Sequence, residues 1–336
     1  MDFLKKNYKK ISDILKAVQL PEHDEIFELT DNVSTILEKE NKSYRPYNSD
    51  NKPGGLVDFS NSKLPVVVIP DLHARPKFLL NILDYKINGN LTVFEALSKK
   101  KINVVCVGDI LHSEKNSKER WIAAQTEFDN GIYTGPSMSA EMQEGLSLLC
   151  GVLKLKQMFP EHFHWLKGNH ENILNRTADG DFSFRKYADE GHMVKSFLQE
   201  YYGDDIVYMI HCVECDLPLM FAGKNCVISH AEPKTAFTKQ QVIDARLDKN
   251  IVEGLTWTDN DEAEFGSVEQ TIKNVCNVED VSEYVYLGGH RPVNKSYELR
   301  QHGLYIQIHN PAMQNIAYIK TKSKFNPNTD IIEVKK

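Results

Sequence analysis

The sequence predicts an α/β fold in which short buried strands alternate with helices. Two observations carry this prediction. Apolar, β-favouring runs, such as Val66 to Ile69 and Asn103 to Val107, recur along the chain between stretches with helical periodicity. Five such runs lead into a residue that can bind a metal, often after a glycine that lets the backbone come close. Because open α/β sheets bind ligands at the carboxyl ends of their strands, we expect a functional site at that edge.

The composition is that of a globular protein. The chain has 336 residues, of which 41% are hydrophobic and 26% charged, which is enough for one large domain or two ordinary ones. A net charge of −7 gives no basic surface, so we expect no specific nucleic-acid binding. The first residues lack the apolar run of a signal peptide, and no stretch approaches about 18 apolar residues. We therefore expect no membrane segment and a cytoplasmic location.

The remaining elements follow from periodicity and turn residues. Two amphipathic helices are predicted at 3–18 and 24–40, followed by a loop at 41–63. Further helices are predicted at 116–129, 138–158, 184–202, 236–246 and 266–275. Strands are predicted near 206–211, 217–222, 225–230, 281–287, 297–300, 304–309 and 315–320.

These elements suggest a division of the chain. We expect an N-terminal helical extension and loop at 1–63, a main domain at 64–325 and a polar tail at 326–336. The helical pair at 115–158 is predicted to be an insertion in the main domain. Because it leaves from the strand end at Asp109, it is a candidate cap over the site.

The metal-capable residues occur in a fixed order. A carboxylate and an imidazole two residues apart suit a divalent metal, but one such pair is common by chance, and a single histidine more often satisfies a hydrogen bond in the core. The repetition is what argues for a metal site. In chain order, the motifs are Asp71-Leu72-His73, Gly108-Asp109, Gly168-Asn169-His170-Glu171, His230 and Gly289-His290.

This order resembles the calcineurin-like metallophosphoesterases, and within them the phosphoprotein phosphatase branch. Residues 166–171 are similar to the L-R-G-N-H-E of that family, and Trp257-Thr258-Asp259 is similar to its W-S-D. The resemblance implies the metallo-dependent phosphatase fold, a two-sheet β sandwich flanked by helices (α/β/β/α). With the insertion, it also implies a helical cap.

The resemblance further implies two divalent metal ions, which could be Mn, Fe or Zn, because Asp, Asn and His accept all three. It assigns Asp71 and His73 to the first ion. It assigns Asn169, His230 and His290 to the second, with Asp109 bridging both. Such a pair lowers the pKa of bound water to about 7, so a metal-bound hydroxide attacks phosphorus directly. His170 would act as general acid on the leaving oxygen, and Glu171 would brace the loop.

The chain departs from the family after Asp109. Where the family has G-D-x-V-D-R-G, this chain has Gly108-Asp109-Ile110-Leu111-His112-Ser113-Glu114, so an aspartate becomes His112 and a phosphate-binding arginine becomes Ser113. His112 could contact phosphate or tune His170, or Glu114 could orient His170. Arg120 could supply the missing guanidinium, and Arg246 stands where the family places a phosphate-binding arginine. Both could instead be ordinary surface arginines.

A last candidate lies near the C-terminal end of the predicted domain. His309 falls where the family runs a strand past the site, so it is a candidate to contact a metal ligand.

These features predict hydrolysis of a phosphomonoester carried by a protein or a small molecule. The enzymatic alternative is a phosphodiesterase or a dinucleoside polyphosphate hydrolase. The non-enzymatic alternative is an inactive binding protein that kept the fold. The complete ligand set, with His170 present, argues against an inactive binding protein.

Overall fold

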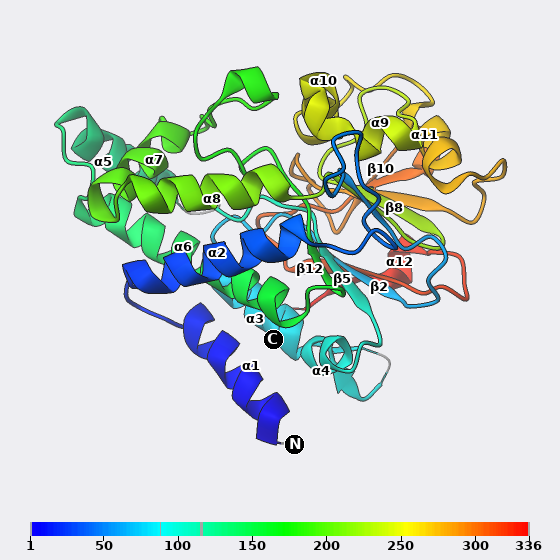
Figure 1. Cartoon of the computed structure of the whole chain (residues 1–336), viewed down its shortest axis with the longest axis horizontal. Coiled ribbons are helices and arrows are strands. Elements are labelled where there is room, and N and C mark those ends of the chain that lie inside the picture. Colours follow the sequence, from blue (N-terminus) through cyan, green and yellow to red (C-terminus); the bar gives the residue numbers. More distant parts are fainter. Residues whose placement is uncertain (1, 88, 115–116, 335–336) are drawn as a thin grey trace.

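Two β-sheets packed face to face form the centre of the molecule, and helices cover both outer faces (Figure 1). The computed structural model describes residues 2–87, 89–114 and 117–334. The five-stranded sheet has the order β13-β12-β2-β5-β6, formed by Ile331–Glu333, Asn315–Ile319, Val66–Ile69, Asn103–Cys106 and Phe163–Trp165. The six-stranded sheet has the order β1-β7-β8-β9-β11-β10, formed by Leu56–Asp58, Met220–Ala222, Cys226–Ser229, Val285–Gly288, Tyr305–Gln307 and Glu298–Arg300. The predicted α/β/β/α architecture is confirmed.

Parallel pairing brings the ends of the motif-bearing strands together. In the five-stranded sheet, β2, β5 and β6 are parallel neighbours, with Val67 opposite Val104 and Val105 opposite His164. In the other sheet, β8, β9 and β11 are parallel neighbours. The carboxyl ends of these strands therefore lie at one edge of each sheet, which is where the motifs follow.

Alternation along the strands fills the layers of the sandwich. In β2, Val66 and Val68 pack between the sheets, whereas Val67 and Ile69 point to the helical layer. This period of two is the consequence of the pleat, which turns successive side chains to opposite faces. Both faces of β2 are thus buried, as its unbroken apolar run predicts.

Among the described residues, one group of eight helices lies on the side of the five-stranded sheet, and a second group of three covers the six-stranded sheet. Figure 1 shows the two groups on opposite sides of the sheets. The first group is α1 to α8, formed by Asp2–Leu15, His23–Glu38, Pro76–Asp84, Val93–Ser98, Lys118–Asp129, Pro136–Met158, Glu190–Tyr201 and Asp204–Asp216. The second is α9 to α11, formed by Lys239–Ile243, Lys249–Thr256 and Ser267–Cys276. A hairpin, β3–β4 (Lys86–Ile87 and Leu91–Thr92), precedes α4, and a short helix, α12 (Pro327–Asp330), precedes β13.

The predicted insertion consists mainly of a core helix. The helix α6 is buried along most of its length and packs on α1, α2, α3, α7 and β6. Its Met and Leu positions therefore fill the layer over the sheet. Ser117 and Arg120, at the start of α5, line a cavity that His73 also lines. Residues 115 and 116, where the predicted insertion begins, lie outside the described residues.

The strand predicted near 206–211 is wrong, because this stretch belongs to helix α8. Its β-branched content favours a strand, but Ile206, Ile210 and Val213 recur at helical spacing and are buried. They face inward where α8 packs against α2. Tertiary packing thus overrides local preference. The helix α10 was not predicted.

The predicted loop and the predicted tail each contribute an edge strand to a sheet. Within the predicted loop at 41–63, β1 pairs in parallel with β7. Within the predicted tail at 326–336, β13 pairs with β12, and residues 335–336 lie outside the described residues. The boundaries at 63 and 325 remain predictions. Across the described ranges of the chain, no helix is long and apolar enough to cross a membrane.

A buried ionic cluster ties the N-terminal segment to the core. The carboxylate of Glu40 accepts hydrogen bonds from Arg45 and, at 2.6 Å, from Lys156 Nζ on α6. Arg45 also donates to the carbonyl oxygen of Asp216 at the end of α8. Burial alone would raise the pKa of Glu40, but Lys156 and Arg45 hold it at about 2. The cluster is therefore ionised at neutral pH and links three segments of the helical layer.

Candidate metal centre

The structure brings all six predicted metal-binding side chains together. They lie at the carboxyl ends of strands from both packed sheets. Three strand ends of the five-stranded sheet supply four of them, and two strand ends of the six-stranded sheet supply the others. Asp109 is at the middle of the group. Its Oδ2 lies 3.5 Å from His73 Nε2 and 3.6 Å from His230 Nε2, so one carboxylate oxygen faces donors from both sheets.

A second convergence involves the amide of Asn169. Its Oδ1 lies 2.8 Å from His230 Nε2 and 3.0 Å from His290 Nδ1. These two imidazole nitrogens are 3.3 Å apart. Three donor atoms from three strand ends therefore face one point, and His230 Nε2 connects this group to the Oδ2 of Asp109.

The loops that carry these residues depend on glycine and on strained backbone. Gly108 has φ 111°, and a Cβ there would collide with the backbone of Gly168. Asp109 and His290 themselves adopt left-handed conformations, with φ of 54° and 66°. Such conformations cost about 1–3 kcal/mol each and persist only where the surroundings enforce them.

Glu171 braces these loops, as predicted. Its buried carboxylate accepts hydrogen bonds from the backbone N–H groups of Asp109 and Ile110, both at 2.9 Å, and of Gly168 at 2.7 Å. The Glu171 side chain therefore fixes the loops that follow β5 and β6 at the point where Gly108 and Gly168 come close together.

Backbone carbonyls fix the tautomers of two histidines. His73 Nδ1 lies 3.0 Å from the carbonyl oxygen of His112, and His230 Nδ1 lies 3.0 Å from that of Val107. Burial lowers the pKa of His73 to about 4 and also lowers that of His230, so both rings are neutral at pH 7. Each Nδ1–H therefore donates to its carbonyl, and each Nε2 lone pair points at Asp109.

The donor set fits divalent metal ions. Both carboxylate oxygens of Asp71 are buried without a hydrogen-bond partner among the described residues, and Asp71, Asp109 and His230 form a group whose possible ligand atoms lie within 4.8 Å of one another. Burial and the neighbouring carboxylates of Asp71 and Glu171 hold the pKa of Asp109 well above its usual range. Buried acceptors that face one another in this way repel unless a cation lies between them. Carboxylate, amide and imidazole donors accept Mn, Fe and Zn alike, so the set does not select the metal.

His112, which stands where the resembled motif has an aspartate, lies beside this cluster. His170 Nδ1 lies 2.9 Å from His112 Nδ1, while His170 Nε2 lies 3.6 Å from Asp109 Oδ2. The ring of Phe184 packs on His170 with centroids 3.8 Å apart. Of the alternatives for His112, the structure favours contact with His170. Phe184 has no motif around it, and the sequence gives no signal for its position.

Acidic side chains hold both of the predicted arginines. Arg120 lines the cavity of about 380 Å³ beside His73, but its Nη2 is engaged by Glu141 and, at 2.7 Å, by Glu144. Its binding to phosphate stays a prediction, which requires those ion pairs to open.

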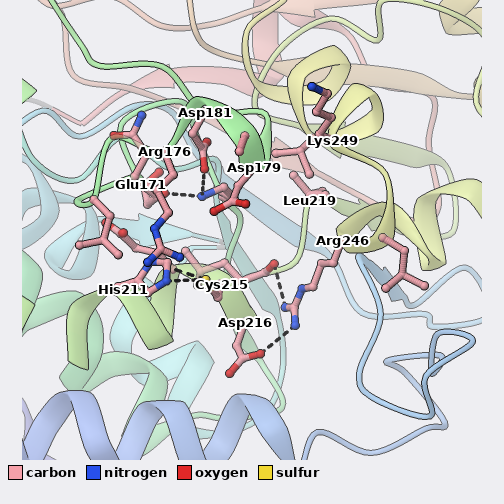
Figure 2. A pocket seen from close by; sticks show the side chains of 18 of the residues that line it. Glu171, Arg176, Asp179, Asp181, His211, Cys215, Asp216, Leu219, Arg246 and Lys249 are labelled. Carbon is pink, nitrogen blue, oxygen red and sulfur yellow. Dashed lines mark hydrogen bonds and ion pairs between the residues drawn. The ribbon is translucent and has the colours of Figure 1, made fainter. Parts of the chain in front are cut away.

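Arg246 lies in another cavity, of about 620 Å³, which none of the six predicted metal-binding residues lines (Figure 2). Its Nη1 donates to Asp216 at 2.8 Å and its Nη2 to the carbonyl oxygen of Leu217 at 3.1 Å. The binding of Arg246 to phosphate therefore stays a prediction, which requires these contacts to open.

Comparison with known proteins supports the fold. No protein-family model matches the chain, and no curated protein matches it either. A protein serine/threonine phosphatase from Saccharomyces cerevisiae is similar in structure, with a TM-score of 0.57, 12% identity and coverage of 93% of this chain and 89% of that one. A cold-active protein-tyrosine phosphatase from a Shewanella species is 12% identical, with a TM-score of 0.47 and coverage of 84% and 82%. At such identity the first match shows a shared fold.

Proposed function

We propose that the protein is a dinuclear-metal phosphoesterase that hydrolyses a phosphomonoester on a protein or a small molecule. One observation carries the proposal. Asp109 Oδ2 lies 3.5–3.6 Å from the Nε2 atoms of His73, His170 and His230, which come from three different strand ends. A bridging carboxylate with imidazoles on both sides, and a further histidine beside it, is the arrangement that two-metal phosphoryl hydrolysis requires.

The side chains divide into two groups around Asp109. Asp71 and His73 would hold one divalent ion, and Asn169, His230 and His290 would hold the other. When bound, the two ions supply a nucleophilic hydroxide at neutral pH and neutralise the phosphoryl oxygens. Because Asn169 is a neutral donor, the carboxylates of Asp71 and Asp109 do not cancel the charge of two dications. A phosphate dianion is therefore attracted to the site.

In this proposal His170 delivers the proton to the leaving group. Its Nδ1 is turned to His112, so its Nε2 faces the metal-binding group. In that position Nε2–H can donate to the leaving oxygen of a substrate, and His112 keeps the ring in this orientation. The ring of Phe184 packs against the buried ring of His170.

Replacement of His170 tests its role as general acid. We expect His170→Asn to lower kcat by about 10²–10⁴-fold for substrates with poor leaving groups, because their oxygen must be protonated as it departs. For p-nitrophenyl phosphate the loss should be much smaller, since its leaving group needs little protonation. Steady-state kinetics on both substrates measures the difference, and an equal loss on both would reassign His170 to a structural role.

A substrate panel tests the proposed reaction. The purified protein, supplied with manganese, is assayed on p-nitrophenyl phosphate, bis-p-nitrophenyl phosphate and diadenosine tetraphosphate. The proposal expects the highest kcat/KM on the monoester. A preference for either of the others would identify a phosphodiesterase or a dinucleoside polyphosphate hydrolase. Metal binding without turnover of any phosphate ester would point to an inactive binding protein.

A further inference from the structure

His309 lies between two carboxylates, directly beside the metal-binding group. It follows the end of β11, which is the neighbour of β9 in the six-stranded sheet, and its side chain is fully buried. Its Nε2 is 2.9 Å from Glu114 Oε2, and its Nδ1 is 3.2 Å from Asp71 Oδ2. The ring centroid is 5.1 Å from that of His73. Asp71, His73 and His309 therefore form one compact group.

Glu114 engages one of the two ring nitrogens of His309. Its carboxylate also pairs with Lys186. A carboxylate that pairs with Lys186 acts as an acceptor, so the hydrogen bond to Glu114 engages the Nε2 of His309. Nδ1 is then the ring nitrogen that remains to bind an ion on the Asp71 side.

The Nδ1 of His309 faces a group of metal-capable atoms. His309 Nδ1 is buried and has no hydrogen-bond partner within the described part of the chain, and the same holds for both oxygens of Asp71. The distance between His309 Nδ1 and Asp71 Oδ2 is short, but the geometry is not that of a hydrogen bond. Two acceptors this close repel each other unless a cation lies near both.

His309 repeats the arrangement of two residues already placed at the metal ions. In His73 and His230, one ring nitrogen donates to a fixed oxygen and the other faces a carboxylate. In His309 the fixed oxygen belongs to Glu114, and the carboxylate is Asp71. A carboxylate that orients a metal-ligating histidine is a recurrent feature of protein metal sites.

We propose that His309 is a further ligand of the metal ion held by Asp71 and His73, and that Glu114 is the residue that positions it. This inference rests on the proposed two-metal centre and adds to it. It gives the first ion a second imidazole, which favours nitrogen-accepting metals such as Zn or Fe over Mg or Ca at that position.

A purely structural role is the competing account. His309 could be an imidazolium that bridges Asp71 and Glu114, in which case it would hold the loops but touch no metal. The two accounts differ in what they predict for the metal-loaded protein, since an imidazolium has no lone pair to offer an ion.

The direct test is a crystal structure of the full chain soaked with Mn²⁺, with anomalous differences used to locate the ions. We expect an ion within about 2.0–2.3 Å of His309 Nδ1 that also contacts Asp71 and His73. Ions bound by Asp71 and His73 with His309 Nδ1 directed elsewhere would overturn this inference and leave the proposed function intact. No ion at any of the six predicted ligands would overturn the proposed function itself.

Metal affinity provides a second test in solution. Wild type, His309→Ala and Glu114→Gln are titrated with Zn²⁺ buffered by a chelator, and bound zinc is counted by mass spectrometry. We expect His309→Ala to lower the affinity for one of the two zinc ions by more than 100-fold. Glu114→Gln should lower it by about 10–100-fold, as for other residues that orient metal ligands. His192→Ala removes an exposed histidine from α7 and is the matched control, with both ions retained. Unchanged binding of both ions by a folded His309→Ala would overturn the inference.

Discussion

Replacing Asp109 by asparagine is expected to lower kcat/KM by about 10³-fold or more, because the change weakens both metal positions at once. Loss of metal-ion stabilisation is worth several kcal/mol, and each 1.36 kcal/mol is tenfold in rate. Asp109 Oδ2 is the atom that faces His73 on one side and His230 on the other. Metal analysis after dialysis should show fewer than two ions per chain, and chelation should remove the remaining activity.

Two further measurements isolate the metal effect. His290→Asn changes only one of the two groups, so we expect a smaller loss and one retained ion. The metal-free Asp109→Asn protein should be at least as stable as metal-free wild type, because burial, Asp71 and Glu171 raise the pKa of this carboxyl and disfavour its charge. Thermal unfolding checks this expectation. Two bound ions and full kcat/KM in Asp109→Asn would contradict the proposed metal centre.

The positions of the six predicted ligands could be read from the sequence because they depend on a simple rule. Each follows a buried strand, and the strands that carry them in each sheet are parallel, so their carboxyl ends must meet. The order of Asp109 and Asn169 along the chain then matches their order across the sheet. No knowledge of side-chain packing is needed for this step.

Contacts between distant segments could not be read in this way. The partner of His309 is Glu114, which is 195 positions away in the sequence and lies well beyond the end of β5. Phe184 reaches His170 from an irregular segment between Thr177–Asp179 and α7. Arg246 matches the family in sequence order, yet Asp216 and the Leu217 carbonyl hold it in a separate cavity. Such placements depend on packing rather than on periodicity.

The dependence on packing also explains the errors in the predicted secondary structure. The β-branched residues of α8 favour a strand in the sequence. The packing of this segment against α2 shows that it is a helix. The strands β1 and β13 lie at sheet edges and have three residues each. Three residues are too few to show the alternation of apolar and polar side chains that predicts a strand. The long helices α2 and α6 were predictable because several turns repeat the same apolar spacing.

Replacing Glu40 by glutamine is expected to destabilise the protein by about 3–5 kcal/mol at neutral pH. The change leaves Arg45 and Lys156 as buried cations without a compensating charge, and breaking a buried ion pair from one side costs this much. Urea or guanidinium unfolding measures the difference. Glu38→Gln, at an exposed position in the last turn of α2, is the matched control and should change stability by no more than about 0.5 kcal/mol.

The pH dependence of this difference gives a second readout. The pKa of Glu40 is about 2 in the folded protein, against an ordinary value of 4.5 for a glutamate in water, so the folded state binds the proton less well than the unfolded state does. The carboxylate therefore contributes stability that is fully present above pH 4.5 and is lost as the pH falls from about 4.5 towards 2. The gap between wild type and Glu40→Gln should narrow over that range, while Glu38→Gln follows wild type. A gap that stays constant down to the acid transition would mean that Glu40 stabilises the helical layer through packing rather than through its charge.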